Sequence, residues 1–108
     1  DPHRYAAARL LAGRAVDALL WVASFTADCA PPPADVPTIV VGHPALAAVP
    51  ARVFIPVATP GIGAAGHLFR LDGTVVVPLA PARADGLPTV AQVIEGIGAR
   101  LRARTVAA

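Results

Sequence analysis

The fold is decided by one stretch of the sequence, which reads Arg52-Val53-Phe54-Ile55-Pro56-Val57-Ala58-Thr59-Pro60-Gly61-Ile62-Gly63-Ala64-Ala65-Gly66-His67-Leu68-Phe69-Arg70-Leu71-Asp72-Gly73-Thr74-Val75-Val76-Val77-Pro78-Leu79. An apolar run is followed by a loop with three glycines and then by two apolar runs separated by Asp72-Gly73. Asp-Gly between β-rich runs favours a type I′ hairpin turn, because that turn needs a positive φ at both central residues. The stretch therefore predicts a strand over 53–57, a glycine loop, and a hairpin of about 67–71 and 74–79.

The residues before this stretch predict two further strands. Residues 18–23 and 38–41 are continuous apolar runs, as expected for parallel strands that are covered on both faces. A short helical segment over 45–49, begun by His43-Pro44, separates the second strand from the third. This alternation predicts an α/β fold, a three-layer sandwich with a mainly parallel, Rossmann-like sheet plus the β-hairpin.

A helix is expected at each end of the chain. Asp1-Pro2 is a favourable helix start, and Gly13 is a natural stop for a helix over 5–12. Thr89 and Gln92 have capping-box spacing at the start of the last helix. Apolar residues follow on one face of that helix, which we expect to dock on the sheet: Val90, Val93, Ile94, Ile97 and Leu101.

Length and composition bound the organisation of the protein. The 108 residues suit a single α/β domain, 1–108. The absence of Met leads us to expect a trimmed chain or the C-terminal fragment of a longer subunit. No apolar run predicts a membrane span or a signal peptide. With Cys29 as the only cysteine, these features favour the cytoplasm.

No catalytic, cofactor-binding or metal-binding set is predicted. The three histidines lack metal-site spacing, and Ser24 lies in no nucleophile elbow. The glycine loop fits G-x-G-x-x-G in letters, but it leads into a predicted strand, whereas the dinucleotide fingerprint leads into a helix. All nine cationic residues are Arg, and the cluster near the C-terminus is explained by the helix dipole. We therefore expect neither nucleic acid nor membrane as a partner.

The segment from Pro56 to Gly73 resembles part of the B subunit of formylmethanofuran dehydrogenases, within the molybdopterin oxidoreductase superfamily. The resemblance rests on Gly61-Ile62, on Gly66 and on Arg70-Leu71-Asp72-Gly73. The family usually carries acidic residues inside the loop, whereas residues 63–65 of this chain are Gly, Ala and Ala. The chain is therefore more similar to the bacterial branch, the B subunit of the formyltransferase/hydrolase complex. Residues 1–25 and 87–101 resemble the flanking parts of the same domain.

The resemblance implies a non-catalytic structural or assembly domain in one-carbon (formaldehyde oxidation) metabolism, by a methanogenesis-like pathway. Its partners would be the other subunits of a hetero-oligomeric complex. No cofactor is predicted in this chain, although the redox relatives hold molybdopterin. The alternative is a domain of an oxidoreductase that binds molybdopterin guanine dinucleotide or another nucleotide.

Two loops and the hairpin supply the candidate ligand or interface residues. In the alternative, purely structural interpretation, Arg70 pairs with Asp72 or caps nearby carbonyl groups, and His67 is a surface residue of a strand. The candidates are Ser24, Thr26, Gly61, Gly63, Gly66, His67, Arg70 and Asp72.

Overall fold

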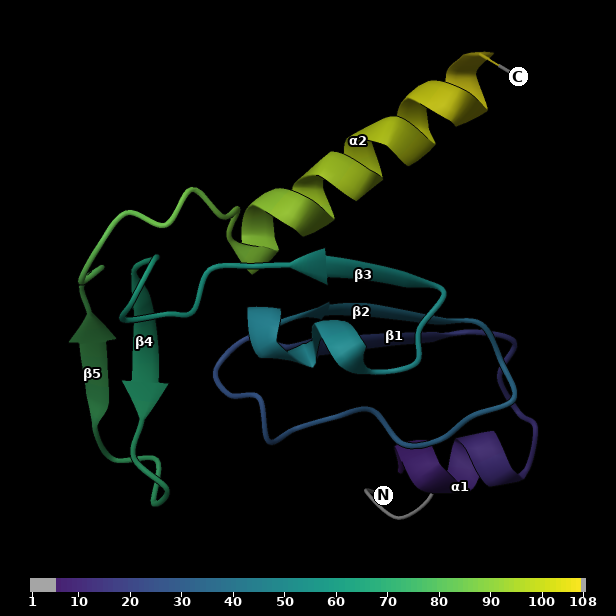
Figure 1. Cartoon of the computed structure of the whole chain (residues 1–108), viewed down its shortest axis with the longest axis horizontal. Coiled ribbons are helices and arrows are strands. Elements are labelled where there is room, and N and C mark those ends of the chain that lie inside the picture. The colour runs from purple at the N-terminus through teal and green to yellow at the C-terminus, as the bar shows by residue number, and fades with distance from the viewer. Residues whose placement is uncertain (1–5, 108) are drawn as a thin grey trace. The chain divides into compact units, whose positions relative to one another are not determined.

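The computed structural model describes residues 6–107. The chain divides into two compact units, Asp1–Ile55 and Pro56–Ala108. A parallel sheet is built largely from the first unit, and an antiparallel hairpin belongs to the second (Figure 1). The predicted α/β class with a parallel sheet and a β-hairpin is confirmed. The expectation of one domain over 1–108 stays a prediction.

The parallel sheet has the strand order β1-β2-β3. Its strands are β1 (Leu19–Ala23), β2 (Thr38–Gly42) and β3 (Val53–Pro56), each within one residue of its predicted bounds at either end. Strand β1 pairs with β2 from Leu19↔Thr38 to Ala23↔Gly42. The central strand is the most buried, with Val40 and Val41 fully inaccessible.

Strand β1 is not covered on both faces, so that expectation was wrong. Leu20 and Val22 are 51% and 48% exposed, whereas Ala23 is buried and Trp21 is half-buried. The alternation is that of an edge strand with one covered face. A continuous apolar run therefore does not by itself predict how many faces of a strand are covered.

The core of this unit lies between the sheet and a short 3₁₀ helix, η1 (Pro44–Ala48). Leu46 of η1 packs with Ala23 and Val40. The predicted start of this segment is confirmed, because His43 Nδ1 accepts a hydrogen bond from Ala45 N–H at 3.1 Å. Residues partly buried against the core are Trp21, Val49, Ala51 and Phe54.

The first helix, α1 (Ala7–Ala12), ends at Gly13, although not as the sequence predicts. Gly13 has an ordinary φ of −82°, and Arg14 is the residue with a positive φ, 54°. Ala15 N–H donates to Leu10 O and Arg14 N–H to Leu11 O, at 3.0 and 3.2 Å. These bonds form a Schellman motif with arginine at the position that favours glycine. The predicted N-cap at Asp1 lies outside the described residues.

The second unit carries the hairpin of β4 (Gly66–Phe69) and β5 (Val76–Leu79). The predicted type I′ turn was wrong, because only Gly73 has a positive φ there, 74°. Gly73 N–H donates to Arg70 O at 2.8 Å, and Arg70 N–H donates to Val75 O at 2.9 Å. Strand β4 therefore ends two residues earlier than predicted and β5 begins two residues later, and the connection runs from Arg70 to Val75.

The last helix, α2 (Val90–Ala107), begins with the predicted capping box. Thr89 N–H donates to Gln92 Oε1 at 2.9 Å, and Gln92 N–H donates to Thr89 Oγ1 at 3.0 Å. The expected burial of its apolar stripe was wrong for much of its length. Leu101 is 59% exposed, and Ile94 and Ile97 are exposed as well. The amphipathic spacing of this stripe is present, without the burial that such spacing predicts.

Candidate functional site

The glycine loop that follows β3 uses its backbone donors internally. Gly61 N–H donates to Ala64 O at 2.8 Å. Ile62 and Gly63 N–H both donate to Thr59 O, at 3.0 and 3.1 Å. A loop that cradles a phosphate needs several N–H groups that converge on one free point. These three N–H groups instead donate to carbonyl oxygens of the same turn, so they are not available to a phosphate.

The opposite side of the same turn is held by the segment after β5. Ala82 and Arg83 N–H both donate to Ile62 O, at 2.8 and 2.9 Å. Asp85 Oδ1 accepts a hydrogen bond from Leu87 N–H at 3.0 Å, which fixes that carboxylate beside the turn. The glycine turn is therefore packed against residues 82–87.

Packing explains why glycine stands at two of these positions. A Cβ on Gly63 would lie 2.0 Å from Asp85 Oδ2, and a Cβ on Gly66 would lie 2.7 Å from Pro60 Cβ. Gly61 is a glycine for a different reason, since its φ is 86°. The three glycines of the G-x-G-x-x-G pattern thus have structural roles in a turn that leads into a strand.

Arg70 and Asp72 meet at the tip of the hairpin, as the structural interpretation predicts. Arg70 Nε donates to both carboxylate oxygens of Asp72 at 2.9 Å, and Arg70 Nη2 also contacts that carboxylate. Thr74 N–H and Oγ1 donate to Asp72 Oδ1 at 3.0 and 2.8 Å. The Arg70 guanidinium, followed by the Thr74 donors, holds the pKa of the Asp72 carboxyl well below its usual range. The tip is a closed set of polar contacts at the surface.

The candidate residues of the second unit do not form one cluster. Gly66 begins β4 and Phe69 ends it, so the glycine turn and the Arg70–Asp72 pair lie at opposite ends of this strand. At 3.3 Å per residue the separation is about 13 Å. His67 lies between them, exposed on β4 opposite Pro78.

The remaining candidates, Ser24 and Thr26, belong to the first unit. They follow the carboxyl end of β1, as the sequence predicts. Thr26 Oγ1 accepts a hydrogen bond from Asp28 N–H at 3.1 Å and so shapes the loop. Trp21 Nε1 donates to Cys29 O at 2.9 Å, while the Cys29 thiol is free and exposed. Local turn bonds thus account for the polar side chain of Thr26.

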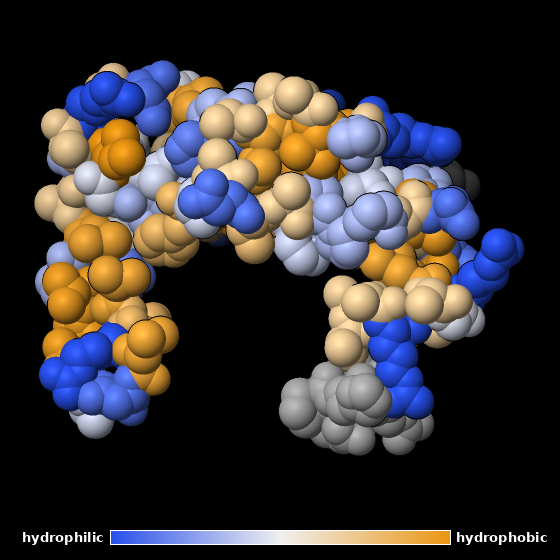
Figure 2. All heavy atoms as spheres, turned by 60° about the horizontal axis from the view of Figure 1, so that its bottom comes forward, coloured by the Kyte–Doolittle hydropathy of each residue, from blue (hydrophilic) through white to orange (hydrophobic). Residues whose placement is uncertain are grey.

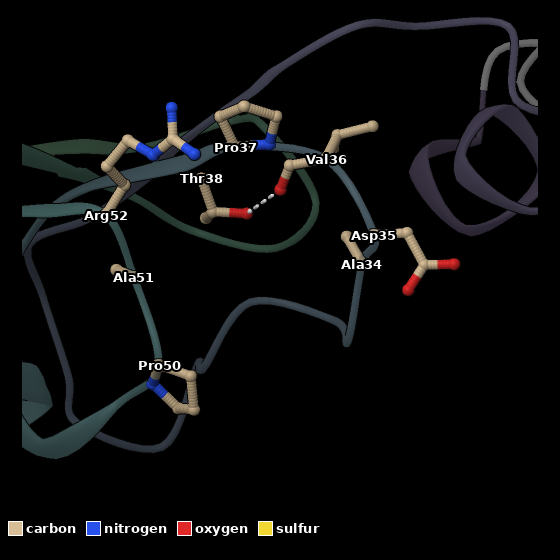
Figure 3. Close-up of a pocket in the computed structure, with 8 residues that line it drawn as sticks. All are labelled: Ala34, Asp35, Val36, Pro37, Thr38, Pro50, Ala51 and Arg52. Atoms are coloured by element: carbon tan, nitrogen blue, oxygen red, sulfur yellow. Dashed lines mark hydrogen bonds between the residues drawn. The ribbon is translucent and has the colours of Figure 1, made fainter.

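Sequence reasoning missed an open pocket of about 320 Å³ in the first unit (Figure 3). It lies where β2 and β3 begin, whereas ligands of open α/β sheets bind at the carboxyl ends of the strands. In Figure 3 the Asp35 carboxylate points away from Arg52, and Thr38 Oγ1 donates to Val36 O at 3.2 Å. The sequence signal for this pocket is a pair of prolines in its lining, Pro37 before β2 and Pro50 before β3. The lining residues are Ala34, Asp35, Val36, Pro37, Thr38, Pro50, Ala51 and Arg52.

Within residues 6–107, no three His, Cys, Asp or Glu side chains come together as a metal site. Among the helices that the structure describes, none has the length and apolar character to cross a membrane. Comparison with known proteins adds no relative, since no family model, curated protein or solved structure matches the chain.

Proposed function

We propose that this chain is a non-catalytic structural or assembly domain of a formylmethanofuran dehydrogenase-like B subunit. The complex would be the formyltransferase/hydrolase complex of one-carbon metabolism. The resemblance that suggests this family rests on the motif Gly61-Ile62, Gly66 and Arg70-Leu71-Asp72-Gly73. The main observation in favour of a non-catalytic role is the glycine turn, whose backbone donors are bonded within the turn.

That turn supports a structural role over a cofactor-binding role. The N–H groups of residues 61–63 donate to carbonyl oxygens of the turn itself. The Asp85 carboxylate occupies the space where a side chain at Gly63 would lie. A carboxylate beside the turn also repels a pyrophosphate, whose charge has the same sign. The alternative, a dinucleotide-binding domain, would have to open this turn before a phosphate could reach its N–H groups.

An assembly role is supported by the apolar surface of the second unit. Leu71 at the hairpin tip is fully exposed, and Phe69 is 65% exposed. Figure 2 shows the limb formed by β4 and β5 as mostly hydrophobic, with a polar end. Contiguous apolar surface on a folded protein marks interaction sites. The exposed large apolar residues of the hairpin are Leu68, Phe69, Leu71, Val75, Val76 and Val77.

The test is co-expression of this chain with the other subunits of a formyltransferase/hydrolase complex. We expect stable co-purification, and we expect no turnover of formylated pterin or furan by the 108-residue chain alone. Turnover by the isolated chain that His67→Ala abolishes would contradict the proposal. So would the absence of this chain from the purified complex.

Calorimetry with GDP separates the alternative function. A dissociation constant of ~100 μM or lower, about −5.5 kcal/mol, would favour the dinucleotide-binding domain. The matched variant is Asp85→Asn, which removes the negative charge beside the glycine turn but keeps its volume. If GDP binds neither the original chain nor Asp85→Asn, the charge alone is not what excludes it, and the closed turn accounts for the result.

A further inference from the structure

The two long edges of the β4–β5 hairpin differ. Arg70 N–H donates to Val75 O, and in the same register Leu68 lies opposite Val77. In antiparallel sheets, hydrogen-bonded pairs alternate with non-bonded pairs. Leu68 therefore bonds across to Val77, whereas His67 and Phe69 point their N–H and C=O groups away from β5.

On β5 the same alternation directs the backbone groups of Val76 and Pro78 outward. Proline has no N–H, so the outer edge of β5 lacks a donor at Pro78. The outer edge of β4 keeps both donors, at His67 and Phe69. No backbone acceptor outside the strand ladder is found for either N–H among residues 6–107. Strand β4 is thus the edge that an added strand can use.

The side chains of β4 are compatible with a second copy of the same strand. Residues 66–69 carry no formal charge apart from the titratable His67, and Leu68 is 52% exposed. At the tip, Arg70 is already paired with Asp72, so the edge has no unpaired like charges. The other exposed apolar surface, on α2, is different, because Arg100 and Arg104 lie beside its stripe.

We propose that a second copy of this chain pairs with β4 in antiparallel orientation, with the two-fold axis at Leu68. His67 then lies opposite Phe69 of the second copy, and Phe69 lies opposite its His67. Both residues of each pair have outward backbone groups, so each pair exchanges two N–H···O=C bonds. The register is self-complementary, as a two-fold interface requires.

The pairing also explains how this hairpin is stabilised. A two-stranded hairpin alone is marginally stable in water, whereas three or more strands with an apolar face are stable. The two copies together form a four-stranded sheet in the order β5-β4-β4-β5. At the axis, the Leu68 side chains of the two copies face each other at a non-bonded position, where Cα atoms are about 4.5 Å apart.

The test measures the mass of the full chain by sedimentation equilibrium over about a hundredfold range of concentration. We expect a monomer–dimer equilibrium. Leu68→Asp and Leu68→Lys each place like charges at the axis and should raise the dissociation constant by about tenfold or more. Mixing the two variants should restore the dimer, because the charges at the axis are then opposite.

Proline variants test which edge is used. His67→Pro removes an outward donor from β4 and should abolish the dimer, whereas Val76→Pro removes one from β5 and should leave it intact. Circular dichroism serves to check that both variants fold. A monomer at every concentration, open-ended polymers, or no dimer on mixing the Leu68 variants would overturn the proposal. Because this test uses the chain alone, its outcome is separate from co-purification with other subunits, which tests the proposed function.

Discussion

Arg70 donates hydrogen bonds to the carboxylate of Asp72, two residues further along the chain, and the same carboxylate accepts two hydrogen bonds from Thr74. Side-chain hydrogen bonds therefore hold the connection between β4 and β5 together. A two-residue hairpin turn would need only backbone hydrogen bonds. Both side chains stay more than 45% exposed, so solvent screens the pair. Its main effect is to fix the shape of the connection.

The first prediction concerns the titration of Asp72. Its pKa is lowered in the folded chain, chiefly by Arg70. The contribution to stability is therefore complete above the unfolded value of about 3.9, and it is lost as pH falls through the lower folded value. NMR titration of the Asp72 carboxyl should give a midpoint below that of an unfolded peptide. Arg70→Gln should move the midpoint back up, and an unchanged midpoint in that variant would contradict the assigned cause.

The second prediction concerns Gly63. Gly63→Ala should destabilise the chain by about 1 kcal/mol, because its Cβ would lie 2.0 Å from Asp85 Oδ2, so that the exposed carboxylate must move and give up its hydrogen bond from Leu87 N–H. Urea unfolding measures the change. Gly63→Ala combined with Asp85→Gly should recover part of the loss. As a control, Gly96→Ala meets nothing within 4 Å, and it should stabilise α2 by about 1 kcal/mol. Equal effects of Gly63→Ala and Gly96→Ala would show that the clash is not real.

The third prediction concerns the end of α1. Arg14 has a φ of 54°, a conformation that costs a residue with a side chain about 1 kcal/mol relative to glycine. Arg14→Gly should therefore raise the free energy of unfolding by up to about 1 kcal/mol, measured by thermal or urea unfolding. Arg14→Ala removes the same charge but keeps the Cβ, so it should give no such gain. A gain in both variants would point to the charge instead of the backbone.

The fourth prediction concerns the start of α2. Thr89→Ala removes the acceptor for Gln92 N–H and should cost about 1 kcal/mol. Thr89→Ser keeps the hydroxyl and should stay close to the original chain. Helix content by circular dichroism and urea unfolding measure both variants. Loss of stability in Thr89→Ser as large as in Thr89→Ala would assign the effect to packing of the methyl group.

Local patterns predicted the elements well because local forces decide them. The capping box at Thr89 and Gln92 needs only two side chains and their own backbone, and it forms as predicted. The bounds of β1 to β3 follow from apolar runs that end at polar or turn residues. The short helix after His43 is likewise set by one ring nitrogen and the following proline.

Predictions failed where a competing contact lay outside the pattern. The Asp72-Gly73 dipeptide favours a two-residue turn, but the Asp72 carboxylate binds Arg70 and Thr74 and stabilises a longer connection. The exposure of Leu20 and Leu101 depends on what covers β1 and α2, which periodicity cannot specify. For the candidate site, the contact of Gly63 with Asp85 joins residues distant in sequence, so no spacing rule could reveal it.

Pro78 has a consequence for solubility. A strand edge that can accept one copy of itself can usually accept more, and that is how ordered fibrils grow. Once two copies have joined through β4, the edges left at both sides belong to β5, and each of them has a missing donor at Pro78. Further strands would lose a hydrogen bond at every addition. In the proposed pair, Pro78 therefore disfavours further growth through the β5 edges.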